Sequence, residues 1–164
     1  MMERLSLRQA EPSDATAIWS IIQPIIAKGD TYAFAPSSSK EEMLSYWMGI
    51  RKHTYVAEYD GKLVGTFVLQ ANQPGLGSHI ANAGYMVDTA YGGLGIGKAM
   101  CLFSMKEAKR LGYVALQFNL VIKSNIRAIQ LWKKLGFQVI GEIPEAFQHQ
   151  ELGLTNALIM YQKL

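Results

Sequence analysis

The sequence predicts a single α/β domain over residues 1–164, with a central mixed sheet and helices on both of its faces. The chain is 164 residues long, which suits one domain with a hydrophobic core and is too short for two ordinary domains and a linker. Apolar residues make up 49% and charged residues 18%, the mix of a folded globular protein. Segments in which apolar and polar residues alternate are interspersed with segments whose apolar residues recur at helical spacing.

The first half of the chain is predicted to hold a strand, two helices and a hairpin. Leu5 and Leu7 lie on one side of the first alternating segment, as in a half-buried strand. Pro24 is expected to kink or end the first helix, because proline removes a helical hydrogen bond. Asp60 and Gly61 separate two β-rich segments, which is a strong hairpin signal. The predicted elements are a strand at 4–9, helices at about 12–24 and 39–50, and strands at 55–58 and 63–69.

The second half is predicted to continue with alternating strands and helices. Alternation along residues 114–121 places Gln117 and Asn119 on the strand face opposite Leu116 and Phe118. The predicted elements are a strand at 79–87, a helix at 96–111, a strand at 114–121, a helix at about 125–135, and closing strands at 137–141 and 158–162.

Composition and charge exclude several classes of function. The net charge of +3 suits an anionic ligand, but the sixteen basic residues are scattered and form no cluster of the kind that nucleic acids require. Cys101 is the one cysteine, so neither an intrachain disulfide nor a structural zinc site fits, and no metal is expected. Residues 1–9 lack the apolar run of a signal peptide, and no segment approaches the ~20 apolar residues of a membrane span. We expect a cytoplasmic protein that binds neither nucleic acid nor a membrane.

A cluster of glycines is the main candidate for ligand binding. Gly92, Gly93, Gly95 and Gly97 lie between a predicted strand and a predicted helix. Backbone N–H groups and the helix dipole can converge on a phosphate at such a junction. Only glycine lets the backbone approach so closely. A flexible turn is the simpler alternative, but the density of glycines favours an anion site.

Two nucleotide-binding motifs compete to explain this loop. The segment from Gly92 to Lys98 nearly matches the G-x-x-x-x-G-K motif of P-loop proteins, but Ala99 stands where a hydroxyl would bind magnesium. The G-x-G-x-x-G motif of dinucleotide-binding folds fails at Lys98. A P-loop nucleotide-binding protein stays open as an alternative.

Two longer motifs make the chain similar to the GCN5-related N-acetyltransferases. The first is Tyr85-Met86-Val87-Asp88 leading into Gly92-Gly93-Leu94-Gly95-Ile96-Gly97, and the second is Asn125-Ile126-Arg127-Ala128 leading into Leu131-Trp132-Lys133-Lys134-Leu135-Gly136-Phe137. They stand in that family's order and spacing, and the order of elements agrees along the whole chain. The resemblance implies a mixed, mostly antiparallel sheet of about seven strands flanked by four helices, splayed between the strands at 79–88 and 114–121.

The resemblance also implies an acetyl-CoA-dependent N-acetyltransferase, and it assigns roles. Backbone groups of Met86 and Val87 would bind the pantetheine arm, and a backbone N–H near Val87 would stabilise the oxyanion. Asn125 would lie beside the pantetheine and the thiol while capping the helix that carries Ala128 and Trp132. The pyrophosphate would be bound by the amides of the loop, which are those of Gly92, Gly93, Leu94, Gly95, Ile96, Gly97 and Lys98.

The chain departs from this family at two positions. Gly92 replaces the usual Gln or Arg, so one side-chain contact to phosphate is lost while the backbone cradle remains. Trp132 replaces a tyrosine that often protonates the departing thiolate, and an indole cannot donate a comparably acidic proton. Water, Tyr85 and Tyr32 are the remaining candidates for that proton, and a non-catalytic acyl-CoA-binding module becomes a further alternative. Deprotonation of the amine is expected to run through water.

A closer resemblance concerns the acceptor. The segments 29–34, 81–87 and 117–119 are similar to the fungal acetyltransferases that detoxify proline analogues such as azetidine-2-carboxylate. There the asparagines that match Asn82 and Asn119 hold the imino acid and the acetyl donor, so both are predicted as catalytic and substrate-binding residues. Considered without the resemblance, each asparagine could equally be a structural bridge between strands.

The expected reaction is direct acetyl transfer to a small amine or imino acid in a ternary complex. Tyr32 and Phe34 could form the wall of a site for a small ring, and Tyr85 is placed with them at the substrate. Dimers are common among similar proteins, so a homodimer is a possible assembly.

Overall fold

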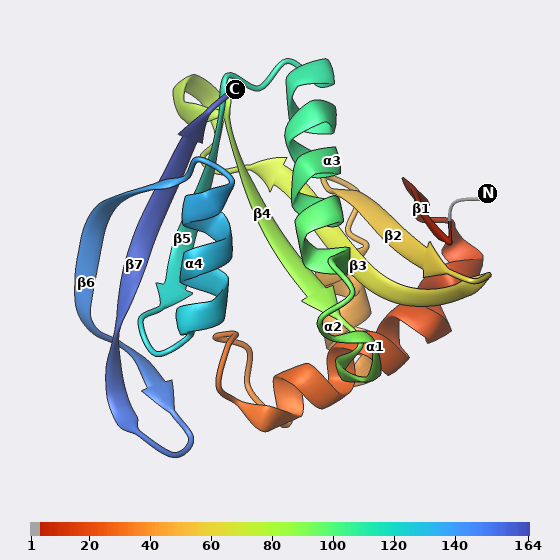
Figure 1. The fold of residues 1–164 in the computed structure, drawn as a ribbon, viewed down its shortest axis with the longest axis horizontal. Helices are drawn as coiled ribbons and strands as arrows, with labels where there is room; N and C mark the ends of the chain where they lie inside the picture. The colour runs from red at the N-terminus through yellow and green to blue at the C-terminus, as the bar shows by residue number, and fades with distance from the viewer. Residues whose placement is uncertain (1–3) are drawn as a thin grey trace.

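The computed structural model describes residues 4–164 as a seven-stranded sheet with four α-helices (Figure 1). The strands are β1 (Leu5–Gln9), β2 (His53–Tyr59), β3 (Lys62–Ala71), β4 (Ile80–Val87), β5 (Ala115–Ile122), β6 (Gln138–His149) and β7 (Gly153–Lys163). The helices are α1 (Ala15–Lys28), α2 (Lys40–Trp47), α3 (Ile96–Arg110) and α4 (Ile126–Lys134). Short 3-10 turns at Pro12–Asp14, Gly75–Gly77 and Thr89–Tyr91 precede α1, β4 and α3. The α/β class and the mixed sheet are confirmed.

The sheet is antiparallel at every pairing except one. Its strand order is β1-β2-β3-β4-β5-β7-β6, and β4 and β5 are the parallel neighbours. These two strands pair only where residues 80–82 lie beside residues 115–117, and they then diverge, as Figure 1 shows. The predicted splay is confirmed, and it opens the sheet near its middle.

Two helices cover each face of the sheet. On one face, α1 and α2 bury residues such as Ile22 against Val68 of β3. On the other face, Met100 of α3 and Ile129 of α4 belong to a buried cluster with Phe67. Successive side chains of a strand point to opposite faces, so β3 supplies Phe67 to one layer and Val68 to the other.

Helix α1 continues through Pro24, so of the two expectations for this residue, a kink or the end of the helix, the second is wrong. Proline lacks the N–H that would bond a carbonyl one turn earlier. Ile21, Ile22 and Ile26, on both sides of Pro24, are buried against the sheet, and this packing maintains the helix across the missing bond. The helix ends at Lys28, where Gly29 adopts a left-handed φ of 66°.

The end of the chain also differs from expectation, because β6 and β7 form a hairpin much longer than the strands predicted at 137–141 and 158–162. Register shifts between Val139 and Gly141 and between Ile143 and Phe147 break the alternation of β6, which removes the period-two signal. Helix α2 ends at Trp47, earlier than predicted. The hairpin at Asp60-Gly61 is confirmed, with φ of 50° and 80° as a two-residue turn requires.

No helix in the described residues 4–164 combines the length and the apolar character needed to cross a membrane. In the same part of the chain, no three His, Cys, Asp or Glu side chains are grouped as metal ligands would be.

Candidate functional site

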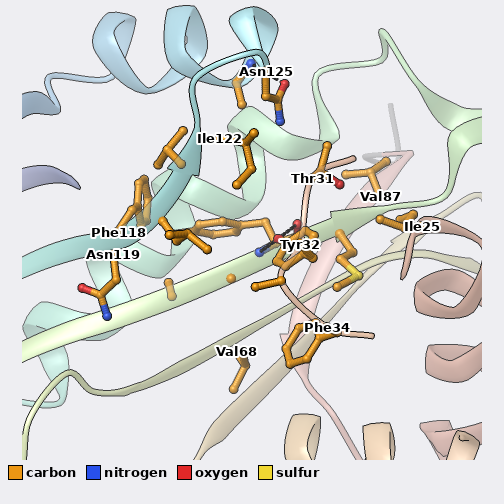
Figure 2. A pocket seen from close by; sticks show the side chains of 18 of the residues that line it. Ile25, Thr31, Tyr32, Phe34, Val68, Val87, Phe118, Asn119, Ile122 and Asn125 are labelled. Carbon is orange, nitrogen blue, oxygen red and sulfur yellow. Dashed lines mark hydrogen bonds between the residues drawn. The ribbon is translucent and has the colours of Figure 1, made fainter. Parts of the chain in front are cut away.

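The opening between β4 and β5 contains a cavity of about 590 Å³ (Figure 2). Ile25 and Phe34 line it on the side of α1 and α2, and Asn125 and Ala128 line it at the first turn of α4. The cavity exists because β4 and β5 stop pairing after Asn82, so the sheet is not closed there by backbone hydrogen bonds. Its size is typical of a site for a small ligand.

Most of the predicted site residues meet at this cavity. The predicted residues that line it are Tyr32, Phe34, Asn82, Tyr85, Met86, Val87, Asn119, Asn125, Ala128 and Trp132. They come from four separate segments of the chain, which the fold brings together. The loop residues 92–98 do not line the cavity; they lie at the start of α3, after the end of β4.

The edge of β4 that faces the cavity carries the backbone groups of its odd-numbered residues. The carbonyl of Ile80 accepts a hydrogen bond of 2.8 Å from the N–H of Asn72, so the even-numbered residues turn their backbone groups toward β3. Backbone groups alternate in direction along a strand. Ala83, Tyr85 and Val87 therefore direct theirs into the opening between the strands.

This alternation supports the predicted role of the Val87 backbone and contradicts that of the Met86 backbone. Val87 directs its N–H toward the opening, where a bound thioester or pantetheine could accept it. Met86 pairs with Thr66 of β3, so its backbone groups are not free for the pantetheine arm, contrary to the prediction. Met86 lines the cavity while its side chain is buried among residues of α1 and α2.

The glycine loop has the geometry of an anion site. Gly93 and Gly95 have φ of 81° and 77°, and a Cβ at either position would meet no atom within 4 Å, so this side of the loop is open. The first intrahelical bond is donated by Ala99 to the carbonyl of Gly95 at 3.0 Å. The N–H groups of Ile96, Gly97 and Lys98 precede that bond and point out of the helix end. They are positioned for a phosphate.

Helix α4 brings three predicted residues to the cavity. Asn125 caps the helix, its side chain accepting from the N–H of Ala128 at 3.3 Å, so the predicted cap is confirmed. Trp132 lines the cavity and also packs against Tyr85 and Phe118, with ring centroids 5.2 and 5.0 Å away. Trp132 therefore belongs to both the core and the cavity wall.

Tyr85 lines the cavity, but its hydroxyl is engaged elsewhere. The hydroxyl lies 2.6 Å from the Ser104 Oγ on α3, and Ser104 in turn donates to the carbonyl of Cys101. Burial raises the pKa of Tyr85 well above its ordinary value. Tyr85 is therefore not the proton donor for a departing thiolate.

The hydroxyl of Tyr32 is bonded to the backbone of Tyr85. It accepts the N–H of Tyr85 at 2.8 Å and donates to the carbonyl oxygen of the same residue. Burial raises the pKa of Tyr32 above its ordinary value. The ring is stacked on Phe34, with centroids 6.1 Å apart, so both predicted aromatic residues form one wall of the cavity.

Asn82 lines the cavity and also bridges the two strands that border it. Its Nδ2 donates to the carbonyl of Gln117 on β5 at 3.1 Å, where the parallel pairing ends. Asn82 therefore has the role of a structural bridge between strands, which was the alternative to substrate binding in the sequence analysis. A role in substrate binding is compatible with it, because the side-chain oxygen is not used in this bond.

Asn119 lies on the strand face that alternation predicted. Both Phe118 and Asn119 reach the cavity wall, but Phe118 is 5% exposed in the cluster beneath α3 and α4, whereas Asn119 is exposed and its side chain bonds that of Gln117. Its Nδ2 donates to Asn72 Oδ1 at 2.7 Å, and its Oδ1 accepts from Gln117 Nε2 at 2.9 Å. A ligand would have to share or replace these exposed bonds.

Sequence reasoning missed several residues of the cavity wall. Ile25, Tyr46 and Val68 line it from three different elements. Tyr46 meets Phe34 edge to face, with ring centroids 5.0 Å apart. In the sequence they are ordinary apolar positions of amphipathic segments, so no local signal distinguishes them from core.

The interior of the cavity is neutral. Among the described residues, Lys28 and Asp30 are the charged ones that line it, and they pair with each other at 3.1 Å. The Lys28 side chain is 70% exposed, so this pair lies at the surface, where it contributes little to stability. The remaining polar lining consists of amides, hydroxyls and backbone groups.

Comparison with known proteins gives a consistent result. The sequence pattern of the Acetyltransferase (GNAT) family matches residues 19–137. A solved GCN5-related N-acetyltransferase from Kribbella flavida is similar along the whole length of both chains, with 39% identity and a TM-score of 0.93.

Two curated relatives are also similar. N-acetyltransferase aca1 of Schizosaccharomyces pombe is 36% identical over 89 residues, which are 54% of this chain and 43% of that protein. The L-amino acid N-acetyltransferase AaaT of Escherichia coli is 29% identical over 142 residues, which are 85% of this chain and 86% of that protein. The match thus spans less than half the length of the S. pombe relative.

Proposed function

This chain belongs to the GNAT family of acetyltransferases, and on that premise we propose that it transfers the acetyl group of acetyl-CoA to a small amine or imino acid. The transfer is direct, with both substrates bound at once. The observation that carries the proposal is the cavity between the splayed strands, because it joins an open backbone edge of β4, the start of α4 and an apolar pocket.

The donor is assigned to the part of the opening nearest α3 and α4. Its pyrophosphate would bind the free N–H groups at the start of α3, where the open side of Gly95 leaves room for phosphate oxygens. Its pantetheine arm would follow the edge of β4 past Val87. Asn125, at the start of α4, lines the cavity close to where the thiol would lie.

The acceptor is assigned to the side of α1 and α2. An amine must lose its proton before it attacks a thioester, and burial in a neutral, mostly apolar cavity lowers the pKa of an amine. Tyr32 and Phe34 offer flat apolar surface, and the amides of Asn82 and Asn119 can bond a carboxylate and an amine. An α-amino or cyclic imino acid fits this combination, and the similarity to the L-amino acid N-acetyltransferase of E. coli favours amino acids.

The chemistry needs few groups from the protein. The amine nitrogen attacks the thioester carbon, and a backbone N–H of β4 stabilises the negative charge that develops on the oxygen. The tetrahedral intermediate then releases the thiolate of CoA. Among the described residues that line the cavity, Asp30 is the one carboxylate and it is paired with Lys28, and no histidine lines it; we therefore assign the amine proton to water.

The decisive experiment measures free CoA thiol released from acetyl-CoA by the purified protein with amino acids, cyclic imino acids, polyamines and peptides, each product being verified by mass spectrometry. Release that depends on a small amino or imino acid supports the proposal. Acetyl-CoA binding without thiol release for any amine would favour an acyl-CoA-binding module instead. Preferential acetylation of peptides or polyamines would refute the assigned acceptor class. Gly95→Asp is the matched control, since it should weaken the response to every acceptor equally.

A further inference from the structure

The hydroxyl of Tyr32 occupies the middle of the β4 edge that borders the cavity. It is bonded to both backbone groups that Tyr85 directs into the opening, the N–H at 2.8 Å and the carbonyl oxygen. These two residues are 53 positions apart in the chain, so the contact is made by the fold and not by a local turn. Figure 2 shows Tyr32 in the interior of the cavity, between Phe34 and Val87.

Several contacts hold the Tyr32 ring in place. It stacks on Phe34 at an interplanar angle of 14°. It also packs over Gly84 of β4 beside the Trp47 ring, since a Cβ at Gly84 would be in ordinary contact, at 3.6 Å, with both aromatic side chains. Because its ring is already fixed, the Tyr32 hydroxyl loses little conformational freedom when a ligand binds, which is what preorganisation of a hydrogen-bond donor means.

The position of the hydroxyl oxygen marks where a ligand oxygen can bind. An acceptor oxygen 2.8 Å from a backbone N–H, in a mostly apolar cavity, has the geometry of an oxyanion-binding position. A thioester carbonyl entering the opening would take that N–H, and the hydroxyl would then be released from it. The Tyr32 hydroxyl, which donates its hydrogen bond to the Tyr85 carbonyl in this structure, would then donate it to the incoming thioester oxygen.

We infer that the Tyr32 hydroxyl is a catalytic group that donates, together with the N–H of Tyr85, to the thioester oxygen of the acetyl donor. The inference rests on the proposed function, because it requires a thioester in this cavity. The C–N bond forms and the C–S bond breaks, the amine loses its proton to water, and the thiolate departs with the electron pair of the C–S bond. Tyr32 keeps its own proton throughout, because burial raises its pKa and the phenol stays neutral. Tyr32 acts as a hydrogen-bond donor. It does not replace the proton-donating tyrosine that the family often carries at the position of Trp132.

The test compares Tyr32→Phe with Tyr55→Phe. Tyr55 is a buried tyrosine whose hydroxyl bonds Glu107 at 2.9 Å outside the cavity, so this control removes a phenol hydroxyl without touching the site. Loss of one oxyanion donor lowers kcat by about 10²- to 10³-fold. Tyr32→Phe should show a loss of this size with an unchanged Kd for CoA, and Tyr55→Phe should keep the kcat of the unmodified protein.

A spectroscopic readout separates donation from a merely structural role. Infrared difference spectra of bound [1-¹³C]acetyl-CoA, recorded without any amine, report hydrogen bonds to the thioester carbonyl. The stretch should lie at lower frequency in the unmodified protein than in Tyr32→Phe, and 3,5-difluorotyrosine at position 32, a stronger donor of the same shape, should lower it further. Equal frequencies in all three proteins, or an unchanged kcat in Tyr32→Phe, would overturn the inference while leaving the acetyltransferase proposal intact. An unmodified protein that neither binds acetyl-CoA nor acetylates any amine would overturn both.

Discussion

Alanine at Asn82 and Asn119, introduced one position at a time, should separate substrate binding from strand bridging. Asn82 bonds the carbonyl of Gln117 at 3.1 Å in a partly buried position where β4 and β5 last pair. Asn119 is exposed, and its amide bonds the side chains of Asn72 and Gln117. The two residues therefore share a place at the cavity but differ in their structural role.

The expected effects on stability follow from those contacts. A net intramolecular hydrogen bond contributes about 0.5–1.5 kcal/mol, so Asn82→Ala should lower the free energy of unfolding by about 1 kcal/mol. For a domain of this length, that change lowers the melting temperature by roughly 2–4 °C. Asn119→Ala, at an exposed position, should stay within about 0.5 kcal/mol.

The expected effects on activity are the same for both variants. A hydrogen bond to a charged group contributes about 1.5–3 kcal/mol, so each variant should lose roughly ten- to a hundredfold in kcat/KM for the acceptor. The Kd for acetyl-CoA, measured by calorimetry, should be the same in both variants as in the unmodified protein. The kinetics require the thiol-release assay with the best acceptor, and the melting temperature is followed by circular dichroism.

Asn119→Ala is the cleaner probe, because its stability should barely change. Full activity of this variant on every acceptor would refute its assignment to the substrate. A loss above about 3 kcal/mol in Asn82→Ala would show that the strand bridge, and not substrate binding, accounts for the effect at that position.

Gly95→Asp should raise the KM for acetyl-CoA strongly, because a side chain and a negative charge enter the phosphate site. Gly153→Asp, at a similar φ of 75° outside the site, is the control and should leave the KM unchanged. Equal KM values for the two variants would show that the loop does not bind the phosphates. In a thermal-shift assay, acetyl-CoA at a hundred times its Kd should stabilise the fold by about 2.7 kcal/mol. ATP with magnesium should not stabilise it, because Ala99 supplies no hydroxyl to the metal. Stabilisation by ATP and magnesium alone would contradict this prediction. Bonds from Arg8 lower the pKa of the buried Asp14 carboxyl below its value of about 3.9 in the unfolded chain, so the carboxylate stabilises the fold above that pH, and the contribution is lost as the pH falls through the lower folded pKa. Asp14→Asn should therefore flatten the fall of the melting temperature on acidification below about pH 5, and an unchanged slope would show that the ion pair does not matter.

Much of the secondary structure could be predicted, because its signals are local. Alternation placed Asn119 and Phe118 on opposite faces of β5 correctly, and Asp60-Gly61 marked a hairpin that the structure contains. Local signals did not decide between a kink and a helix end at Pro24, and the structure shows that the helix does not end there, because buried isoleucines on both sides of Pro24 pack against the sheet. Local signals failed in β6, where two register shifts interrupt the alternation.

The candidate site was predicted in its parts but not in its connections. The residues of β4, α4 and the segment near residue 32 were named from motifs and resemblance, and they do meet at one cavity. The direction of the Met86 backbone was wrong, since it depends on the register of β4 against β3. The substrate, the homodimer, the single-domain boundaries and the cytoplasmic location stay predictions.

The sequence by itself determined the α/β class, the order of strands and helices, the glycine-rich start of α3 and the family, because each depends on residues a few positions apart or on motifs of fixed spacing. Only the tertiary structure decided which backbone groups of β4 are exposed, that Asn82 bridges to β5 over 35 positions, and that Tyr32 meets Tyr85 over 53. Those contacts follow from the register of the sheet and from the point where β4 and β5 separate. Both are fixed by the packing of all seven strands and their helices, which no local stretch of sequence encodes.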